Sequence, residues 1–195
     1  MAMPLSPCTE LSVAQQRELL AIARRSIAEG FANAAPLRLQ LDSMEAALQE
    51  PAAVFVTLTQ NGELRGCIGS LQALDPLAQA VADAAFNSAF RDPRFEPLQA
   101  ADMDAITIEI SVLSALEPFA VKSRTELLSS LRPGIDGLLI EDCGRRATFL
   151  PKVWDKISSP EAFVEQLMLK AGLPAGHWSE TIRVRRYSTL TFAEN

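Results

Sequence analysis

The chain has 195 residues, of which 48% are hydrophobic and 22% are charged, and its formal net charge is −6. This length and composition are typical of a globular protein with one large domain, or with two lobes that share a core. The negative charge disfavours broad binding to a phosphate backbone, which needs a basic face. No apolar run reaches the roughly 18 residues of a membrane span.

The cysteines, at positions 8, 67 and 143, are too few and too scattered for a disulfide framework. Since the N-terminus also lacks the pattern of a secretory signal, we expect a cytoplasmic protein in a reducing compartment. Residues 1–10 are expected to form a flexible arm, and residues 11–195 a single domain. The basic stretches at 145–146 and 183–186 are expected to be solvated strand faces.

The first part of the chain alternates helical and extended patterns. Hydrophobic periodicity predicts a helix over 12–29, a short helix over 43–50, and strands over 53–59 and 63–68. Ser12 is the expected N-cap of the first helix, and Gly30 the residue just after its end. The pair Asn61-Gly62 is a strong hairpin signal, so the two strands should be antiparallel.

The second part of the chain also mixes helical and extended patterns. The predicted elements are a helix over 75–90, a strand over 105–113, a helix over 123–131, a hairpin of strands over 137–141 and 145–150, a helix over 159–172, and a terminal strand over 181–192. Asp75 is expected to cap its helix, which carries one charged residue, Asp83, before Arg91 and should be mostly buried. Because the order shows no steady βαβ rhythm, we expect an α+β fold with a mainly antiparallel sheet covered by helices.

The hexapeptide Leu64-Arg65-Gly66-Cys67-Ile68-Gly69 is the strongest candidate for a site. Alternation along a strand puts Arg65 and Cys67 on one face and Leu64, Gly66 and Ile68 on the other. A guanidinium beside a thiol favours the thiolate form. Gly66 and Gly69 would let a ligand approach the backbone, whose amides could hold an anion.

Packing alone also explains this hexapeptide. A cysteine between glycines is often a small hydrophobic residue at a tight contact, and the glycines could serve only to let a helix lie close to the strand. The sequence therefore leaves open a reactive thiol and a packing residue at position 67.

Five other polar residues are candidates for a role. Asn87 places an amide on the nearly uncharged helix, where a hydrogen bond to a neighbouring loop is the simpler explanation. Arg94 could join Arg65 in binding an anion, or could simply pair with Asp92. Glu109 could be a general base, a partner of Arg65, or a solvent residue. Lys152 is either a binding residue or an ordinary surface lysine.

Several chemistries lack the residues they need. The single histidine, His177, has no neighbours that mark a catalytic triad, and one His with three dispersed Cys makes no usual zinc or iron site. There is no phosphate-binding loop, dinucleotide fingerprint or three-cysteine cluster. We therefore expect no resident metal and no cofactor.

The hexapeptide at 64–69 also carries a resemblance to a known family. The chain resembles the AMMECR domain family, whose hallmark is Leu-Arg-Gly-Cys-Ile-Gly, matched here without departure. Further matches follow in the family's order at 87–90, 92–95, 109–113, 134–137, 150–151 and 170–173. The similarity extends from about residue 12 to residue 193.

The resemblance implies a protein with a large and a smaller lobe and a cleft near the hallmark motif. It also implies partners, because bacterial and archaeal members often accompany a Memo-like relative of extradiol dioxygenases and a radical SAM enzyme. This chain would then be one component of a multi-protein modification system. It would contribute a thiol, an arginine-lined pocket for a small molecule, or a docking surface.

Three hypotheses follow. In the first, Cys67 is a nucleophile or an acyl or alkyl carrier, Arg65 activates it, amides near Gly66 and Gly69 hold an oxyanion, and Glu109 is a candidate base. In the second, the protein is a non-catalytic scaffold for the Memo-like and radical SAM proteins. In the third and weakest, the C-terminal arginines bind nucleic acid.

Overall fold

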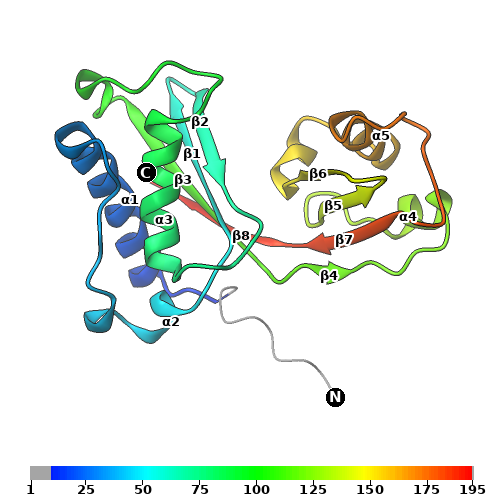
Figure 1. The fold of residues 1–195 in the computed structure, drawn as a ribbon, viewed down its shortest axis with the longest axis horizontal. Coiled ribbons are helices and arrows are strands. Elements are labelled where there is room, and N and C mark those ends of the chain that lie inside the picture. The colour runs from blue at the N-terminus through cyan, green and yellow to red at the C-terminus, as the bar shows by residue number, and fades with distance from the viewer. Residues whose placement is uncertain (1–9, 195) are drawn as a thin grey trace. The chain divides into compact units, whose positions relative to one another are not determined.

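The computed structural model describes residues 10–194, so most of the predicted arm over 1–10 lies outside the described residues. The chain divides into two compact units. One unit comprises the chain up to Leu113 together with the segment from Leu190 onward, and the other is Ser114–Thr189. Figure 1 shows the elements of each unit.

The first unit is a four-stranded sheet covered by helices. Its elements are α1 (Val13–Asn33), η2 (Leu41–Ser43), α2 (Ala46–Gln49), β1 (Val54–Gln60), β2 (Glu63–Gly69), α3 (Leu77–Phe90), η3 (Ala100–Asp102), β3 (Ile106–Leu113) and β8 (Thr189–Ala193). The strand order is β2-β1-β3-β8, and β1 pairs antiparallel with both β2 and β3. Helices α1 and α3 lie against the sheet (Figure 1).

Alternation along the strands builds the core of this unit. Val56 of β1 is opposite Ile110 of β3, and both are fully buried in one cluster with Leu19 of α1 and Val81 of α3. The alternate residues of the strands, including Thr57, lie on the opposite face of the sheet. The sheet therefore has a face buried under helices and a second, more polar face.

The second unit is a smaller sheet with helices of its own. Its elements are β4 (Glu117–Pro118), α4 (Arg124–Ser130), β5 (Gly137–Asp142), β6 (Arg145–Phe149), η4 (Pro151–Asp155), α5 (Pro160–Lys170) and β7 (Arg183–Tyr187). The strand order is β4-β7-β5-β6, and these neighbours pair antiparallel. A separate buried cluster forms here, in which Trp154 stacks on Phe163 with ring centroids 3.9 Å apart.

The predicted fold class is confirmed: the protein is α+β, with antiparallel sheets covered by helices and a smaller second lobe. Both predicted hairpins are present, and Ser12 caps α1 through a capping box with Gln15. The arginines of the second unit's strands face solvent in part and pair with acids, as Arg146 and Arg185 do with Glu141.

Three local predictions differ from the structure. Helix α1 continues past Gly30, which lies inside the helix against Phe86 and Phe90. The helix ends at Asn33, and its C-cap Ala34 adopts a left-handed φ of 51°. Pro76, not Asp75, is the N-cap of α3, and no side chain caps that end. The predicted short helix over 43–50 is present but shorter, because α2 covers only Ala46–Gln49 and a separate 3-10 turn, Leu41–Ser43, precedes it.

The predicted terminal strand over 181–192 is two strands in two different sheets. The break is at Ser188, whose amide donates to the hydroxyl of Ser114, while the amide of Ser114 donates to the carbonyl of Ser188. These two bonds replace the ladder pairing at this point. The pattern of alternation cannot show that its two halves belong to different sheets.

Candidate functional site

A β-hairpin carries Cys67 to the edge of the first sheet. The turn residues Asn61 and Gly62 have φ values of 53° and 82°, the left-handed conformation that an Asn-Gly hairpin turn needs. Strand β2 returns beside β1 and is the outermost strand in the order β2-β1-β3-β8. Cys67 is opposite Thr57 and is half-buried.

A β-bulge at Arg65 changes which side chains share the thiol's face. Leu58 is opposite Gly66 but Thr59 is opposite Leu64, so Arg65 is the extra residue. Leu64 therefore shares the face of Thr59 and Cys67, and the prediction of unbroken alternation over 64–69 was wrong. The Arg65 guanidinium donates instead to the carbonyl of Glu96, at 2.7 Å.

Asp92 and Arg94 hold both backbone groups of Cys67. The amide of Cys67 donates to Asp92 Oδ2 at 2.9 Å, and Arg94 Nη2 donates to the carbonyl of Cys67 at 3.2 Å. The two side chains also pair with each other, with Arg94 Nη2 2.6 Å from Asp92 Oδ2. This pair satisfies the outward-facing groups of an edge strand, which otherwise would be open to another strand.

The Asp92–Arg94 pair has strong electrostatic consequences. Hydrogen bonds from Arg94 hold the pKa of the buried Asp92 carboxyl well below its usual range, and the amide of Cys67 adds to this effect although burial opposes it. The pKa of Arg94 is raised in turn, mainly by its hydrogen bond to Asp92 and in smaller part by its charge interaction with Cys67. The fixed positive charge next to Cys67 is therefore that of Arg94.

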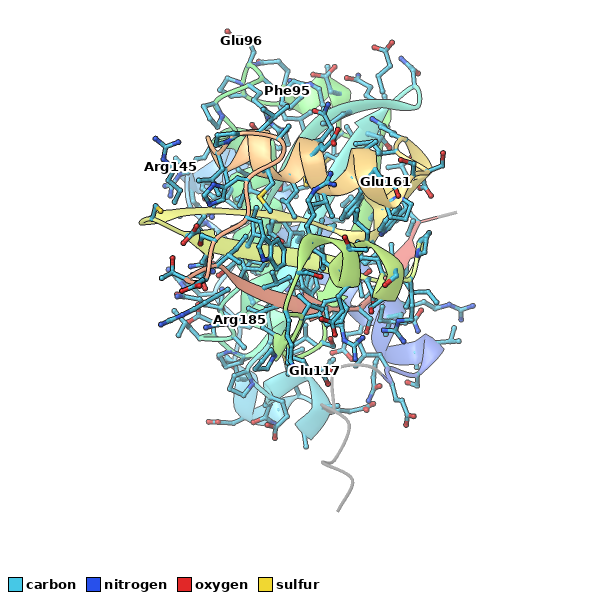
Figure 2. The ribbon with its side chains drawn as sticks, turned by 90° about the vertical axis from the view of Figure 1, so that its right-hand side faces the viewer. Phe95, Glu96, Glu117, Arg145, Glu161 and Arg185 are labelled. Carbon is cyan, nitrogen blue, oxygen red and sulfur yellow. The ribbon has the colours of Figure 1, made fainter. Side chains whose placement is uncertain are left out.

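The loop that carries this pair continues through Phe95 and Glu96. Figure 2 shows both residues at one end of the first unit, with the Glu96 side chain projecting outward. The Arg94 guanidinium lies 5.3 Å from the centre of the Phe95 ring. This contact is a cation–π interaction that keeps the guanidinium close to the loop.

Gly66 and Gly69 are required by packing. A Cβ at Gly66 would lie 2.1 Å from the carbonyl oxygen of Ser88 in α3, and one at Gly69 would lie 2.1 Å from the carbonyl oxygen of Val54. Two backbone amides near these glycines are also hydrogen-bonded. The amide of Ile68 donates to Ser88 Oγ, and the amide of Ser70 donates to the carbonyl of Val54. The amides of Cys67, Ile68 and Ser70 are thus committed to internal partners and are not available to an oxyanion.

The thiol itself belongs to a row of side chains that crosses the sheet. Thr57 is opposite Cys67 on one side and Glu109 on the other, so the three side chains share the polar face. Thr57 Oγ1 donates to Cys67 Sγ at 3.4 Å. Glu109 is two strands from Cys67, about 10 Å away at the usual strand spacing, so it lies on the same face but out of direct reach.

The comparisons with known proteins agree with one another. The model of the AMMECR1 family matches residues 20–192. This chain belongs to the AMMECR1 family. It is 37% identical over 191 residues to a protein of Methanothermobacter thermautotrophicus, covering 95% of this chain and 97% of that relative. A protein of Thermofilum pendens is 34% identical over 200 residues, covering 94% of this chain and 92% of its own length.

A solved structure has the same fold. It is the crystal structure of an uncharacterised protein from Pyrococcus horikoshii, with a TM-score of 0.84 and 32% sequence identity. The match covers 91% of this chain and 90% of that one. This AMMECR1-family protein therefore has the same fold as that protein.

The other predicted site residues lie elsewhere. Asn87 is on α3, where it lines a cavity together with Gly69. Lys152 is an exposed residue of η4, in the second unit. The predicted candidates Gly66, Asp92 and Arg94 thus surround Cys67, Glu109 shares its face, and the roles of Asn87 and Lys152 stay predictions.

Two residues near the thiol were missed by sequence reasoning. Thr57 became part of the site only through the strand register, which the bulge shifts. Ser88 bridges the sheet from α3, since its hydroxyl accepts from Ile68 N and donates to the carbonyl of Val56, at 2.8 Å each. A fully buried serine on an apolar helix is a signal for such a bridge, because a buried hydroxyl needs partners.

His177 is part of a polar cluster in the second unit. Its Nε2 lies 2.5 Å from Asp142 Oδ2, and the hydroxyls of Ser179 and Thr181 also donate to this buried carboxylate. In a catalytic triad the hydroxyl bonds to the imidazole, whereas here all three groups converge on the acid. The arrangement ties the loop to the end of β5.

Over residues 10–194, no group of three or more His, Cys, Asp and Glu side chains could hold a metal ion. Within the same range, no helix is long and apolar enough to cross a membrane.

Proposed function

We propose that this AMMECR1-family protein is a cytosolic, thiol-bearing component of a multi-protein modification system, with Cys67 as the reacting group. The observation that carries the proposal is the double hold on the backbone of Cys67 by Asp92 and Arg94, combined with the hydroxyl of Thr57 at its sulfur. A fixed backbone and a hydrogen bond at the sulfur hold the thiol in one position, which is what a nucleophile needs.

The chemistry is nucleophilic. The sulfur of Cys67 attacks an electrophilic carbon of an activated acyl or alkyl donor, a sulfur–carbon bond forms, and the leaving group departs with its bonding electrons. Arg94 supplies the nearby positive charge, in place of the role first given to Arg65. Glu109 is the candidate base, acting through the hydroxyl of Thr57 because it is too distant to act directly.

The family resemblance supplies the proposed partners. A Memo-like protein and a radical SAM enzyme would carry the metal chemistry, and this chain would carry the transferred group. The alternative is a non-catalytic scaffold for the same two proteins. It predicts a stable complex with both recombinant partners and a thiol at position 67 that can be removed without effect.

The test is the rate of alkylation of each cysteine by iodoacetamide in the native protein, resolved by mass spectrometry. At about pH 6.5, where an ordinary exposed thiol is almost entirely protonated, Cys67 should react faster than the exposed Cys143. If Cys67 stays unmodified until the protein unfolds while Cys143 reacts, the nucleophile proposal fails.

A matched pair of variants sharpens this test. Thr57→Val removes the hydroxyl at the sulfur but keeps the shape of the side chain, so alkylation of Cys67 should slow several-fold. Thr107→Val, an exposed threonine on β3, is the control and should leave the rate unchanged. Equal rates in the two variants would show that the hydroxyl does not activate the thiol.

A further inference from the structure

A cavity of about 280 Å³ lies in the first unit between α3 and the end of β2, and Cys67 is not among the residues that line it. Ligand pockets commonly begin at about 300 Å³, so this one suits a molecule of fragment size. The proposed function of Cys67 makes no use of this cavity.

Small residues on α3 create the space. Ala80 and Ala84 are one turn apart on the helix and both line the cavity, opposite Val54 of β1 and Ile68 of β2. Leu74, a residue that is 74% exposed, adds an apolar surface from the segment before the helix. The walls can therefore hold the apolar body of a ligand.

Polar groups without internal partners meet at this apolar space. Asn87 follows Ala80 and Ala84 along the same face of α3, and its side-chain amide makes no hydrogen bond within the described chain. Asp75 was expected to cap α3, but the cap is Pro76, and across residues 10–194 the Asp75 carboxylate has no hydrogen bond or ion pair. Asp75 is exposed and Asn87 is half-buried, and both line the cavity, so a ligand there would replace water at these two side chains.

The charge of the lining selects the ligand. Asp83 also lines the cavity. Its Oδ1 accepts a hydrogen bond from Gln79 and lies 3.8 Å from the guanidinium of the mostly exposed Arg38. None of the lining residues is a lysine or an arginine. Two carboxylates and an amide oxygen suit a group that donates hydrogen bonds and carries positive charge, and they disfavour an anion.

We propose that this cavity binds a small organic amine, with its apolar body against Ala80 and Ala84 and its protonated nitrogen between Asp75, Asp83 and Asn87. The site goes beyond the thiol chemistry of Cys67. It gives Asn87 and Gly69 a shared place in one pocket, at the opposite end of the hallmark segment from Arg65.

The experiment is a titration of the full ¹⁵N-labelled chain with three probes of one shape: cyclohexylamine, cyclohexanol and cyclohexanecarboxylate. The amine should cause saturable shifts of the amides of Gly69, Ser70 and Ala84, with a Kd of about 1 mM, as expected for so small a ligand. The alcohol should bind at least several-fold more weakly, and the carboxylate should not bind.

Variants assign the binding to the cavity. Asp75→Asn and Asn87→Ala should each weaken amine binding several-fold, whereas Asp104→Asn, at an exposed position on another loop, should leave it unchanged. Ala80→Leu should block the cavity, and its folding can be checked from the dispersion of the same spectra.

The proposal fails if the three probes bind alike, if the shifts lie elsewhere in the first unit, or if no saturable shift occurs up to about 10 mM amine. Since the titration does not involve the thiol of Cys67, such a failure would leave the proposed nucleophile untouched.

Discussion

Cys67 is positioned through its backbone, and the residues that hold it come from a loop 25 residues further along the chain. Asp92 bonds to its amide, Arg94 bonds to its carbonyl, and the two side chains bond to each other. A buried carboxylate with several charge-assisted hydrogen bonds is a strong anchor, because breaking it leaves both partners desolvated and unpaired.

We predict that Asp92→Asn lowers the free energy of unfolding by about 2 kcal/mol, since it removes charge-assisted hydrogen bonds to Arg94 and weakens the bond to the amide of Cys67. Urea unfolding followed by circular dichroism measures the change. The exposed Asp42→Asn is the matched control and should change stability by no more than about 0.5 kcal/mol. Similar losses in both variants would contradict the anchoring role of Asp92.

The close packing at Gly66 leads to a second prediction about a single residue. A methyl group there would lie 2.1 Å from the backbone oxygen of Ser88, and neither backbone can yield easily. Gly66→Ala should therefore destabilise the protein by about 3 kcal/mol, lowering Tm by about 10 °C. Gly176→Ala, where nothing lies within 4 Å of the added carbon, should melt like the parent chain. Thermal denaturation of the two variants measures this difference. If Gly66→Ala melts at the same temperature as Gly176→Ala, the packing at Gly66 is not tight.

At the scale of elements, α3 and the β1–β2 hairpin are joined by a serine that takes part in the strand ladder. The hydroxyl of Ser88 stands between the amide of Ile68 and the carbonyl of Val56, two groups of residues directly opposite each other. A helix residue thereby completes the pairing of two strands. The same close approach explains why position 66 has no side chain.

Ser88→Ala should leave the amide of Ile68 and the carbonyl of Val56 without their bridge, at a cost of about 1–3 kcal/mol. Hydrogen exchange should show faster exchange at Ile68 than in the parent, because its amide then lacks a stable acceptor. Ser130→Ala, on the exposed end of α4, provides the comparison and should alter neither quantity. An unchanged exchange rate at Ile68 would mean that the two strands close the gap directly.

At the scale of the whole molecule, the chain builds two units with separate buried clusters, and the second is inserted within the first. Its first and last segments are joined by the reciprocal bonds of Ser114 and Ser188. Both tryptophans of the chain, Trp154 and Trp178, lie in the second unit, so tryptophan fluorescence reports on that unit alone.

Tryptophan fluorescence can therefore test a prediction about how the stability of the second unit depends on pH. Hydrogen bonds from His177, Ser179 and Thr181 hold the pKa of Asp142 well below its ordinary value. A carboxyl with a lowered folded pKa adds stability that is complete above its unfolded pKa of about 3.9, and that is lost as pH falls toward the folded value. Asp142→Asn should therefore destabilise the second unit at neutral pH, and its deficit relative to the parent should shrink below about pH 4.

Urea unfolding monitored by tryptophan fluorescence at several pH values measures this difference. Asp155→Asn, an exposed aspartate in the same unit, should show no pH-dependent deficit. A deficit for Asp142→Asn that stays constant down to about pH 3 would mean that the carboxyl is not specially stabilised in its ionised form.

Local chemistry made much of the fold predictable. The Asn61-Gly62 turn, the N-cap at Ser12, and the alternation of Ile106, Ile108 and Ile110 each depend on residues close in sequence. These signals were enough for the fold class, for both hairpins and for most helices. The resemblance to the family was likewise visible in the sequence, and the match of the family model over residues 20–192 confirms the family.

The tertiary structure alone decided how these pieces meet. The bulge at Arg65 changed the face of Leu64, the guanidinium beside Cys67 proved to be that of Arg94, and Ser188 split one predicted strand between two sheets. Each outcome depends on register or on contacts between residues far apart in the chain. Periodicity records which side of an element is buried, but it contains no information about which distant backbone group completes a hydrogen bond, and that is what built the site around Cys67.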